Sequence, residues 1–207
     1  MKTVFVNPER CIGCKQCQIA CAVEHSQNKT LYQAIFEERK PRPRILVAPG
    51  IYLDTSFPNK CRHCDPAPCM TVCPSGAISR DASTDSVIVD GDKCISCAMC
   101  ALVCPFDVIT FYSSPKTKLD KTVAIKCDHC VERQGRDEVP ACVEACKVGA
   151  LMFGEINELV KMARTKLAQA VSVAVGEIET ETARIPAHIE AWRSMGQAVN
   201  QIGKEEE

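Results

Sequence analysis

The stretch CIGCKQCQIAC (residues 11–21) places three cysteines within seven residues and a fourth cysteine four residues later. The stretch CISCAMCALVCP (residues 94–105) repeats this spacing and adds a proline. A loop this tight can hold three corners of one cube-shaped 4Fe-4S cluster, and the fourth cysteine lies about one helical turn farther on. In the bacterial run C-x2-C-x2-C-x3-C-P, that fourth cysteine ligates a second cluster. Both stretches therefore predict paired 4Fe-4S clusters.

Two further cysteine groups occur, in CRHCDPAPCMTVCP (residues 61–74) and in CDHCVERQGRDEVPACVEAC (residues 127–146). All 16 cysteines of the 207-residue chain then fall into four groups of four, which is an internal repeat. The candidate ligands are Cys11, Cys14, Cys17 and Cys21 in group one; Cys61, Cys64, Cys69 and Cys73 in group two; Cys94, Cys97, Cys100 and Cys104 in group three; and Cys127, Cys130, Cys142 and Cys146 in group four.

Zinc is the main alternative to iron-sulfur clusters, and disulfides are a more remote one. A zinc site favours two separated C-x2-C knuckles, which the crowded groups one and three do not offer. Groups two and four are less specific by themselves, and group four could hold zinc. The opening segment MKTVFVNPERC (residues 1–11) contains no export signal, so we expect a cytoplasmic location, where thiols stay reduced. Spacing alone leaves open how the groups pair.

Charge and hydropathy limit the possible partners. The formal charge of −1 falls to about −9 if four oxidised clusters and sixteen thiolates are present. Nucleic acid is then an unfavourable partner, because binding it requires a basic surface. No apolar run approaches the roughly 18 to 20 residues of a membrane span, so a membrane link would need a partner protein. With 6 Phe, 3 Tyr and 1 Trp, much of the fold must depend on metal ligation.

Short runs of β-forming residues lie beside the cysteine groups, and they predict strands at 3–6, 87–89, 108–111, 123–125 and 150–153. Residues 43–57 predict a β-hairpin around Pro49-Gly50. Beyond Glu155 the apolar residues recur every three or four positions, which predicts a helix that ends near Gly176. A second helix is expected to begin at Pro186.

Together, the four groups resemble the four-cluster electron-transfer subunits of formate dehydrogenases, hydrogenase complexes, and dimethyl sulfoxide or nitrate reductases. The resemblance covers about residues 1–155 and implies that group one pairs with group four and group two with group three. We number the four implied ligand sets 1 to 4. Set 1 is Cys11, Cys14, Cys17 and Cys146; set 2 is Cys21, Cys127, Cys130 and Cys142; set 3 is Cys61, Cys64, Cys69 and Cys104; set 4 is Cys73, Cys94, Cys97 and Cys100.

The resemblance also implies an α+β fold with two pseudo-symmetric bacterial ferredoxin-like modules. Module A would comprise residues 1–25 and 120–155, module B residues 58–115, and the hairpin insertion residues 40–57. These parts form a four-cluster domain over residues 1–155, and a helical C-terminal extension would follow over 156–207. Lys147 departs from the pattern, because groups two and three have proline after their last cysteine.

The segment CIGCKQCQIACAVEHS (residues 11–26) is most similar to the CooF group of iron-sulfur proteins, which serve carbon monoxide dehydrogenase. This resemblance implies an electron relay between carbon monoxide dehydrogenase and an acceptor oxidoreductase or hydrogenase. The alternative partners are a formate dehydrogenase, a hydrogen-dependent CO2 reductase, formate hydrogenlyase, or a flavin- or NAD-dependent oxidoreductase. Because every group supplies four thiolates, no iron is left open for substrate, and we expect no catalytic residue.

Three other features carry weaker expectations. His63 and His129, each before the second cysteine of its group, are expected to be hydrogen-bond donors near the ligands or solvent-facing rings. The cationic run 39–44 is expected to be a solvated loop, with a docking patch as the alternative. Residues 131–141 are expected to form an ordinary polar insertion. His25 carries no expectation.

Overall fold

The computed structural model describes residues 2–50, 55–114, 117, 121–174 and 194, which include all sixteen cysteines. The chain divides into two compact units, residues 1–155 and 156–207. The first unit mixes short strands with short helices, in agreement with the expected α+β class.

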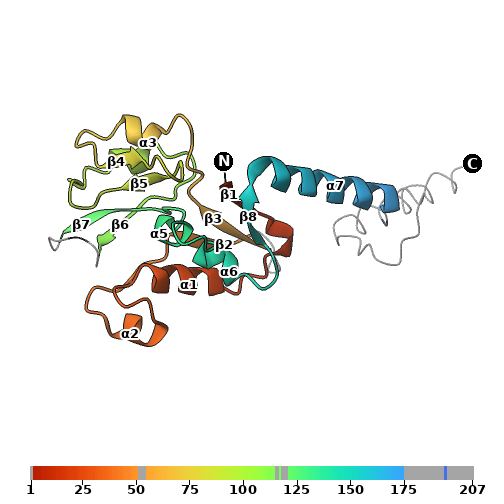
Figure 1. Cartoon of the computed structure of the whole chain (residues 1–207), viewed down its shortest axis with the longest axis horizontal. Helices are drawn as coiled ribbons and strands as arrows, with labels where there is room; N and C mark the ends of the chain where they lie inside the picture. Colours follow the sequence, from red (N-terminus) through yellow and green to blue (C-terminus); the bar gives the residue numbers. More distant parts are fainter. Residues whose placement is uncertain (1, 51–54, 115–116, 118–120, 175–193, 195–207) are drawn as a thin grey trace, which may run out of the picture. The chain divides into compact units, whose positions relative to one another are not determined.

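The two ends of the first unit meet in a two-stranded antiparallel sheet. Strand β1 (Lys2–Val6) pairs with β8 (Leu151–Glu155), with Val4 opposite Phe153 (Figure 1). Val4 and Leu151 are buried on this ribbon, as expected for strands that cover a core on one face. The pairing brings cysteine group one close to group four, although more than a hundred residues separate them in the chain.

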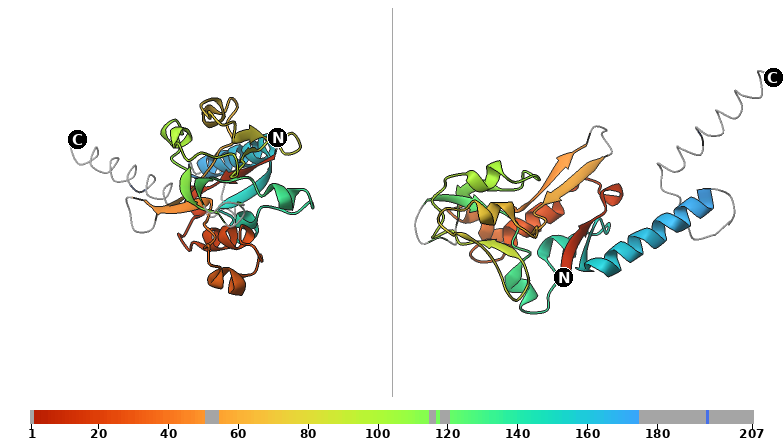
Figure 2. Two further views of the ribbon diagram at one scale, coloured as in Figure 1. Left: turned by 90° about the vertical axis from the view of Figure 1, so that its left-hand side faces the viewer. Right: turned by 90° about the horizontal axis from the view of Figure 1, so that it is seen from above.

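The predicted hairpin is present but extends farther than expected. Strand β2 (Ile45–Pro49) pairs with β3 (Ser56–Lys60), and the Gly50 amide donates to the Thr55 carbonyl at 2.9 Å (Figure 2). The expected end at residue 57 is therefore wrong, because β3 continues to Lys60, directly before Cys61. Pro58 did not stop the strand, since a proline without an N–H is tolerated at a sheet edge. Residues 51–54 lie outside the described part.

Two further two-stranded sheets flank groups two and three. Strand β4 (Ile78–Arg80) pairs with β5 (Val87–Val89), and β6 (Thr110–Ser113) pairs with β7 (Thr122–Ile125). The prediction at 87–89 is confirmed, and the predictions at 108–111 and 123–125 are shifted at their ends. Strand β4 was not predicted, because three residues with polar Ser79 and Arg80 show no clear alternation.

Short helices carry or follow the cysteine groups. Helix α1 (Gln16–Glu24) bears Cys17 and Cys21, and it packs against α6 (Ala141–Glu144). The helix α2 (Leu31–Phe36) follows, and a 3-10 turn η1 (Pro8–Arg10) precedes group one. The remaining short helices are α3 (Pro68–Thr71), α4 (Met99–Leu102) and α5 (Val131–Gln134). The expected polar insertion at 131–141 therefore begins as a helix.

Cysteines form a large part of the core. One buried cluster centres on Val4, Ile45 and Leu151, and a second on Ile78, Val87 and the β7 residues 123–125. Both clusters include cysteine side chains, as does a small third cluster that contains Val108. Cysteine side chains thus supply part of the core packing in a chain that has few aromatic residues.

The second unit contains helix α7 (Ile156–Ala174), where a helix was predicted. The expected end near Gly176 and the second helix from Pro186 lie outside the described residues. Within the described part of the chain, no helix has both the length and the apolar character that a bilayer crossing requires.

Candidate iron-sulfur cluster sites

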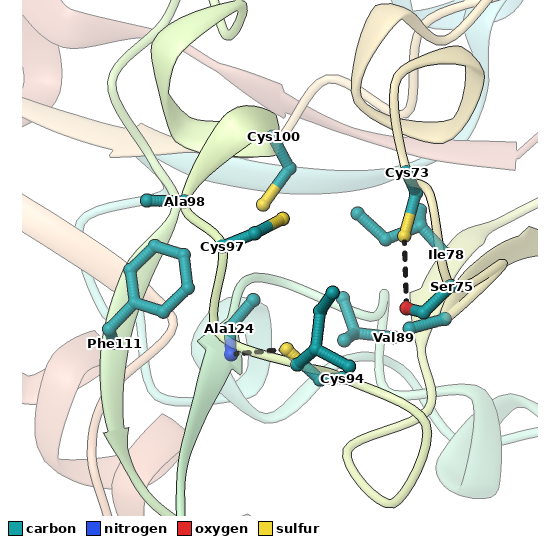
Figure 3. A pocket seen from close by; sticks show the side chains of 12 residues that line it. Cys73, Ser75, Ile78, Val89, Cys94, Cys97, Ala98, Cys100, Phe111 and Ala124 are labelled. Carbon is teal, nitrogen blue, oxygen red and sulfur yellow. Dashed lines mark hydrogen bonds between the residues drawn. The ribbon is translucent and has the colours of Figure 1, made fainter.

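The thiols of set 4 line one small pocket. Cys73 follows α3, Cys94 and Cys97 lie on the loop that leads into α4, and Cys100 lies within α4. Figure 3 shows the four sulfurs pointing toward a common space between the two loops. The Ala124 amide of β7 donates to the Cys94 sulfur at 3.4 Å, and the Ser75 hydroxyl lies 3.7 Å from the Cys73 sulfur.

The thiols of set 3 line a second pocket. Cys61 and Cys64 come from the loop between β3 and α3, Cys69 lies within α3, and Cys104 follows α4. Cys69 lies close enough to Cys61 and Cys104 for their charges to raise its pKa, although burial is the larger cause.

Sets 1 and 2 share helix α1, because Cys17 and Cys21 lie one turn apart on it. Burial, followed by the nearby Cys146 thiolate, raises the pKa of Cys17 to about 11, and Cys11 and Cys14 add to the effect. Burial likewise raises the pKa of Cys21, and its thiolate neighbours are Cys127 and Cys130. The described geometry therefore brings together the members of each set that the resemblance implied.

A common backbone turn shapes all four groups. The residue before the second cysteine has a left-handed conformation in every group, with φ of 68° at Gly13, 51° at His63, 59° at Ser96 and 58° at His129. In three of these turns the amide of that residue donates to the sulfur of the first cysteine at 3.4 Å. Such N–H···S bonds stabilise thiolate over thiol, which suits a metal ligand.

The sulfurs stand too far apart for a single metal ion. Tetrahedral zinc with Zn–S bonds near 2.3 Å requires neighbouring sulfurs about 3.8 Å apart. Among the described residues, the one group of three or more His, Cys, Asp or Glu ligand atoms within 4.8 Å of one another is His25, Asp128 and Cys130. No cysteine quartet meets this limit, so the quartets fit a larger cluster better than zinc. None of the sixteen cysteines, all of them in described residues, is in a disulfide.

Shared buried clusters connect the four sets in a line. Cys17 and Cys146 of set 1 pack with Cys21 and Cys142 of set 2. Cys127 of set 2 packs in turn with Cys61 and Cys104 of set 3. A third cluster joins set 3 to set 4, through Cys69, Cys104, Cys73, Cys94 and Cys100. Sets 1 and 4 are therefore the ends, and they contain the two exposed thiols, Cys14 and Cys97.

Of the two roles expected for His63 and His129, the solvent-facing ring is wrong. Their side chains are buried, and the rings stack at 3.9 Å between centroids with an angle of 24°. His63 Nδ1 accepts the Val87 amide at 2.9 Å, and His129 Nδ1 lies 3.2 Å from the Ser86 hydroxyl. Burial, followed by neighbouring cations, lowers the pKa of both rings, for His129 to about 3.

Two buried lysines beside this stack were missed in the sequence. Lys60 and Lys126 are only 1% and 3% exposed, and both lie between sets 2 and 3. The available signal was a repeat of five residues, KCRHC at 60–64 and KCDHC at 126–130, in which lysine and histidine recur at matching places. The recurring lysine and histidine are easily overlooked, because the cysteines dominate both segments.

His25 also has a role that the sequence did not indicate. It is buried, and its Nε2 lies 3.0 Å from Asp128, while its Nδ1 donates to the Cys21 carbonyl at 2.7 Å. Arg44 forms an ion pair with the same Asp128, and its amide donates to the Cys21 sulfur at 3.2 Å. Burial would raise the pKa of Asp128, but His25 and Arg44 together hold it well below its usual range.

The cationic run 39–44 is thus largely bonded within the molecule. Besides Arg44, Arg39 donates to the Ser114 and Thr117 carbonyls at 3.3 Å, and Arg42 lies over the Tyr112 ring at 4.6 Å. The expectation of a solvated loop is wrong for Arg39 and Arg44, which are half-buried and bonded to other segments, whereas Arg42 is exposed as expected.

Comparisons with known proteins agree with this geometry. A family model described as a 4Fe-4S dicluster domain matches residues 54–156, and a 4Fe-4S binding domain matches residues 8–24. The active-site complex BamBC of benzoyl coenzyme A reductase aligns over 86% of this chain and 96% of that chain, with 19% identity and a TM-score of 0.36, which is too weak a likeness to assign a fold.

Three curated relatives cover most of the chain. The electron transport protein HydN of Escherichia coli K12 is 34% identical over 79% of this chain and 93% of its own. An iron-sulfur protein of Rhodospirillum rubrum is 35% identical over 74% of this chain and 82% of its own. The putative electron transport protein YsaA of Escherichia coli K12 is 36% identical over 75% and 91%, respectively. The chain therefore belongs to the family of ferredoxin-type 4Fe-4S electron transport proteins, and its role is electron transfer and not catalysis.

Proposed function

We propose that the chain binds four 4Fe-4S clusters, one on each of sets 1 to 4, in two pseudo-symmetric ferredoxin-like modules. It would relay electrons along this line between a catalytic redox enzyme and a second redox protein. Each cluster, when bound, supplies a site that gains or loses one electron without making a bond to a substrate. The protein contributes the ligands, the order of the sites and their environment.

The observation that carries the proposal is the combination of complete quartets with wide spacing. Each set offers four thiols, and among the described residues no cysteine quartet is compact enough for a single ion. Four thiolates around one cluster leave every iron with a protein ligand, which disfavours substrate binding at iron and favours electron transfer.

The shared helix supports short steps between neighbouring sites. Residues one helical turn apart lie about 5 to 6 Å from each other. Cys17 and Cys21 have this relation on α1, so clusters on sets 1 and 2 would lie on the order of 10 Å apart. Membership of common buried clusters, for cysteines of sets 2 and 3 and for cysteines of sets 3 and 4, favours similarly short steps there.

The two ends offer different surfaces from the middle. Beside the exposed thiol Cys14 lies Ile12, whose side chain is 69% exposed, and beside Cys97 lies Ile95, which is 63% exposed. Exposed apolar side chains next to a redox centre suit contact with another protein. We therefore assign electron entry and exit to sets 1 and 4.

The resemblance favours carbon monoxide dehydrogenase as the catalytic partner. A formate dehydrogenase, a hydrogenase complex or a flavin- or NAD-dependent oxidoreductase is the alternative. The names of the curated relatives given above identify electron transport and iron-sulfur proteins and do not select one of these enzymes.

The first test is purification of the full chain under strictly anaerobic conditions, with iron, sulfide and zinc analysis. We expect about sixteen irons and sixteen sulfides per chain, with broad visible absorbance that falls on reduction and returns on oxidation. About four zinc ions per chain without sulfide would overturn the proposal.

The second test is recovery of the chain from its native cells and identification of the proteins that remain bound. Recovery of carbon monoxide dehydrogenase would support the favoured partner. A molybdenum or tungsten formate enzyme would replace it and leave the relay itself intact.

A further inference from the structure

Lys60 and Lys126 each precede a cysteine of one middle set in the chain but extend toward the other middle set in space. Lys126 precedes Cys127 of set 2 in the chain, yet its Nζ lies 3.6 Å from the sulfur of Cys61 in set 3. Lys60 precedes Cys61 of set 3, yet its Nζ lies 3.4 Å from His129 Nε2, beside set 2. Each lysine therefore reaches toward the ligands of the other set.

Both amino groups are held by acceptors. Lys126 Nζ donates to the Val87 carbonyl and, at 3.1 Å, to the Cys127 carbonyl, in addition to the Cys61 sulfur. Lys60 Nζ donates to the Cys61 carbonyl at 3.0 Å, and the imidazole of His129 can accept its second hydrogen. Three acceptors around Lys126 match the three donors of an ammonium group.

With clusters bound, the counter-charge for these lysines would come from the cysteines. In the described part of the chain, neither lysine forms an ion pair with a carboxylate. A buried cation without a compensating anion is strongly unfavourable. The thiolates of sets 2 and 3 are the anions at hand, and two loaded clusters would add to their negative charge.

We propose that this crossed pair of lysines raises the reduction potentials of the two middle clusters. The inference rests on the proposed function and deepens it. Reduction adds one electron to a cluster, from a partner protein or a chemical reductant, and no bond forms or breaks. A nearby positive charge stabilises the added electron, and the effect is large where solvent is excluded. The middle clusters therefore hold electrons more readily than they would without Lys60 and Lys126.

The stacked rings of His63 and His129 hold the two lysines in their positions. His129 faces Lys60 through Nε2 and stacks on His63, whose Nδ1 is bonded to the Val87 amide. Val87 also presents its carbonyl to Lys126. The two rings and one residue of β5 thus connect both lysines, which makes His63 and His129 positioning residues.

The test is an anaerobic potentiometric titration of the fully loaded, full-length chain, followed by electron paramagnetic resonance. The variants are Lys60→Met and Lys126→Met, which remove the charge and keep the chain length. We expect the reduced-to-oxidised ratio of one middle cluster to fall at least tenfold at a fixed solution potential, which corresponds to a shift of about 59 mV to lower potential. Lys126→Met should act most on the set 3 cluster and Lys60→Met on the set 2 cluster. The variants Cys64→Ser and Cys130→Ser identify the two signals.

Lys121→Met is the matched control. Lys121 Nζ donates to the Cys94 carbonyl of set 4 at 2.9 Å, but this side chain is half-buried and not enclosed. Its charge is screened by solvent, so a shift smaller than tenfold, confined to the set 4 cluster, is expected. Lys60→Arg and Lys126→Arg should restore the potentials, because they return the charge.

Unchanged potentials in a Lys→Met chain that holds its full iron and sulfide would overturn the inference and leave the proposed relay standing. If a Met variant assembles incompletely, Lys→Gln at the same position replaces it, and unchanged potentials there have the same meaning. An unmodified chain that lacks iron and sulfide is the separate result that removes the proposed function itself.

Discussion

The middle and end cysteine sets of this protein differ in what surrounds them. Sets 2 and 3 lie beside buried charged and imidazole groups, which include Lys60, Lys126 and the histidine stack. Sets 1 and 4 each contain an exposed thiol with an exposed isoleucine nearby. The same ligand chemistry is thus placed in two environments. Under the proposed relay, the middle would determine how strongly an electron is held, and the ends would determine with which protein it is exchanged.

The largest expected difference between middle and ends concerns the loss of one ligand. Cys142→Ala removes a buried thiol at the junction of α1 and α6, where set 2 contributes to the core. Structural metal binding in small domains is worth about 10 kcal/mol or more, so this variant should fail to fold as a loaded chain. Cys14→Ala removes an exposed thiol at one end and should leave a folded chain with about four fewer irons.

Iron analysis and circular dichroism of both variants measure this difference. A Cys142→Ala chain that retains its secondary structure and about twelve irons would show that the middle site is no more important to the fold than the end site.

The second expected difference concerns two aspartates, the partly buried Asp128 and the exposed Asp65. Asp128→Asn leaves Arg44 and His25 without their shared carboxylate. Asp128 and Arg44 are partly buried, with side chains 24% and 16% exposed, so loss of the shared carboxylate costs up to about 3 kcal/mol. Asp65→Asn is the matched control, because Asp65 is exposed and its pair with Arg80 is long at 3.5 Å. Such a surface pair is worth less than about 1 kcal/mol.

Anaerobic urea unfolding of the loaded proteins provides the measurement. Equal losses of unfolding free energy in Asp128→Asn and Asp65→Asn would mean that the buried network contributes nothing special to the middle of the molecule.

The sequence indicated which cysteines lie close together in each loop better than it indicated what surrounds them. Cysteine spacing reports local geometry directly, since the loop and the following helical turn place the sulfurs. The burial of Lys60 and Lys126 depends on contacts between segments more than sixty residues apart, and a lysine with no apolar pattern around it is normally exposed. Arg44 was mistaken for a solvated residue for the same reason, because its partner Asp128 lies 84 positions away.

Hydrophobic patterning was informative where the elements are regular. The period of the apolar residues located α7, and the Pro-Gly turn located the hairpin. Strand β4 and helix α2 escaped prediction, because three to six residues are too few for a periodic pattern to emerge.

The smallest expected effect distinguishes the two ends from each other. Ile12→Asp and Ile95→Asp each place a charge beside one exposed thiol, on side chains that have no part in the core. Each end contacts a different protein under the proposed relay. With the enzyme that co-purifies with the chain as electron donor, one variant should therefore raise KM roughly tenfold, and the other should leave it unchanged.

Val139→Asp is the control, because Val139 is exposed but lies between two ligands of set 2. Steady-state reduction of the chain by that enzyme measures the effect, and dithionite reduction verifies that the clusters are intact. If both end variants, or the Val139 control, raised KM equally, the partner would not distinguish one end set from the other. The proposal that the end sets determine with which protein an electron is exchanged would then be wrong.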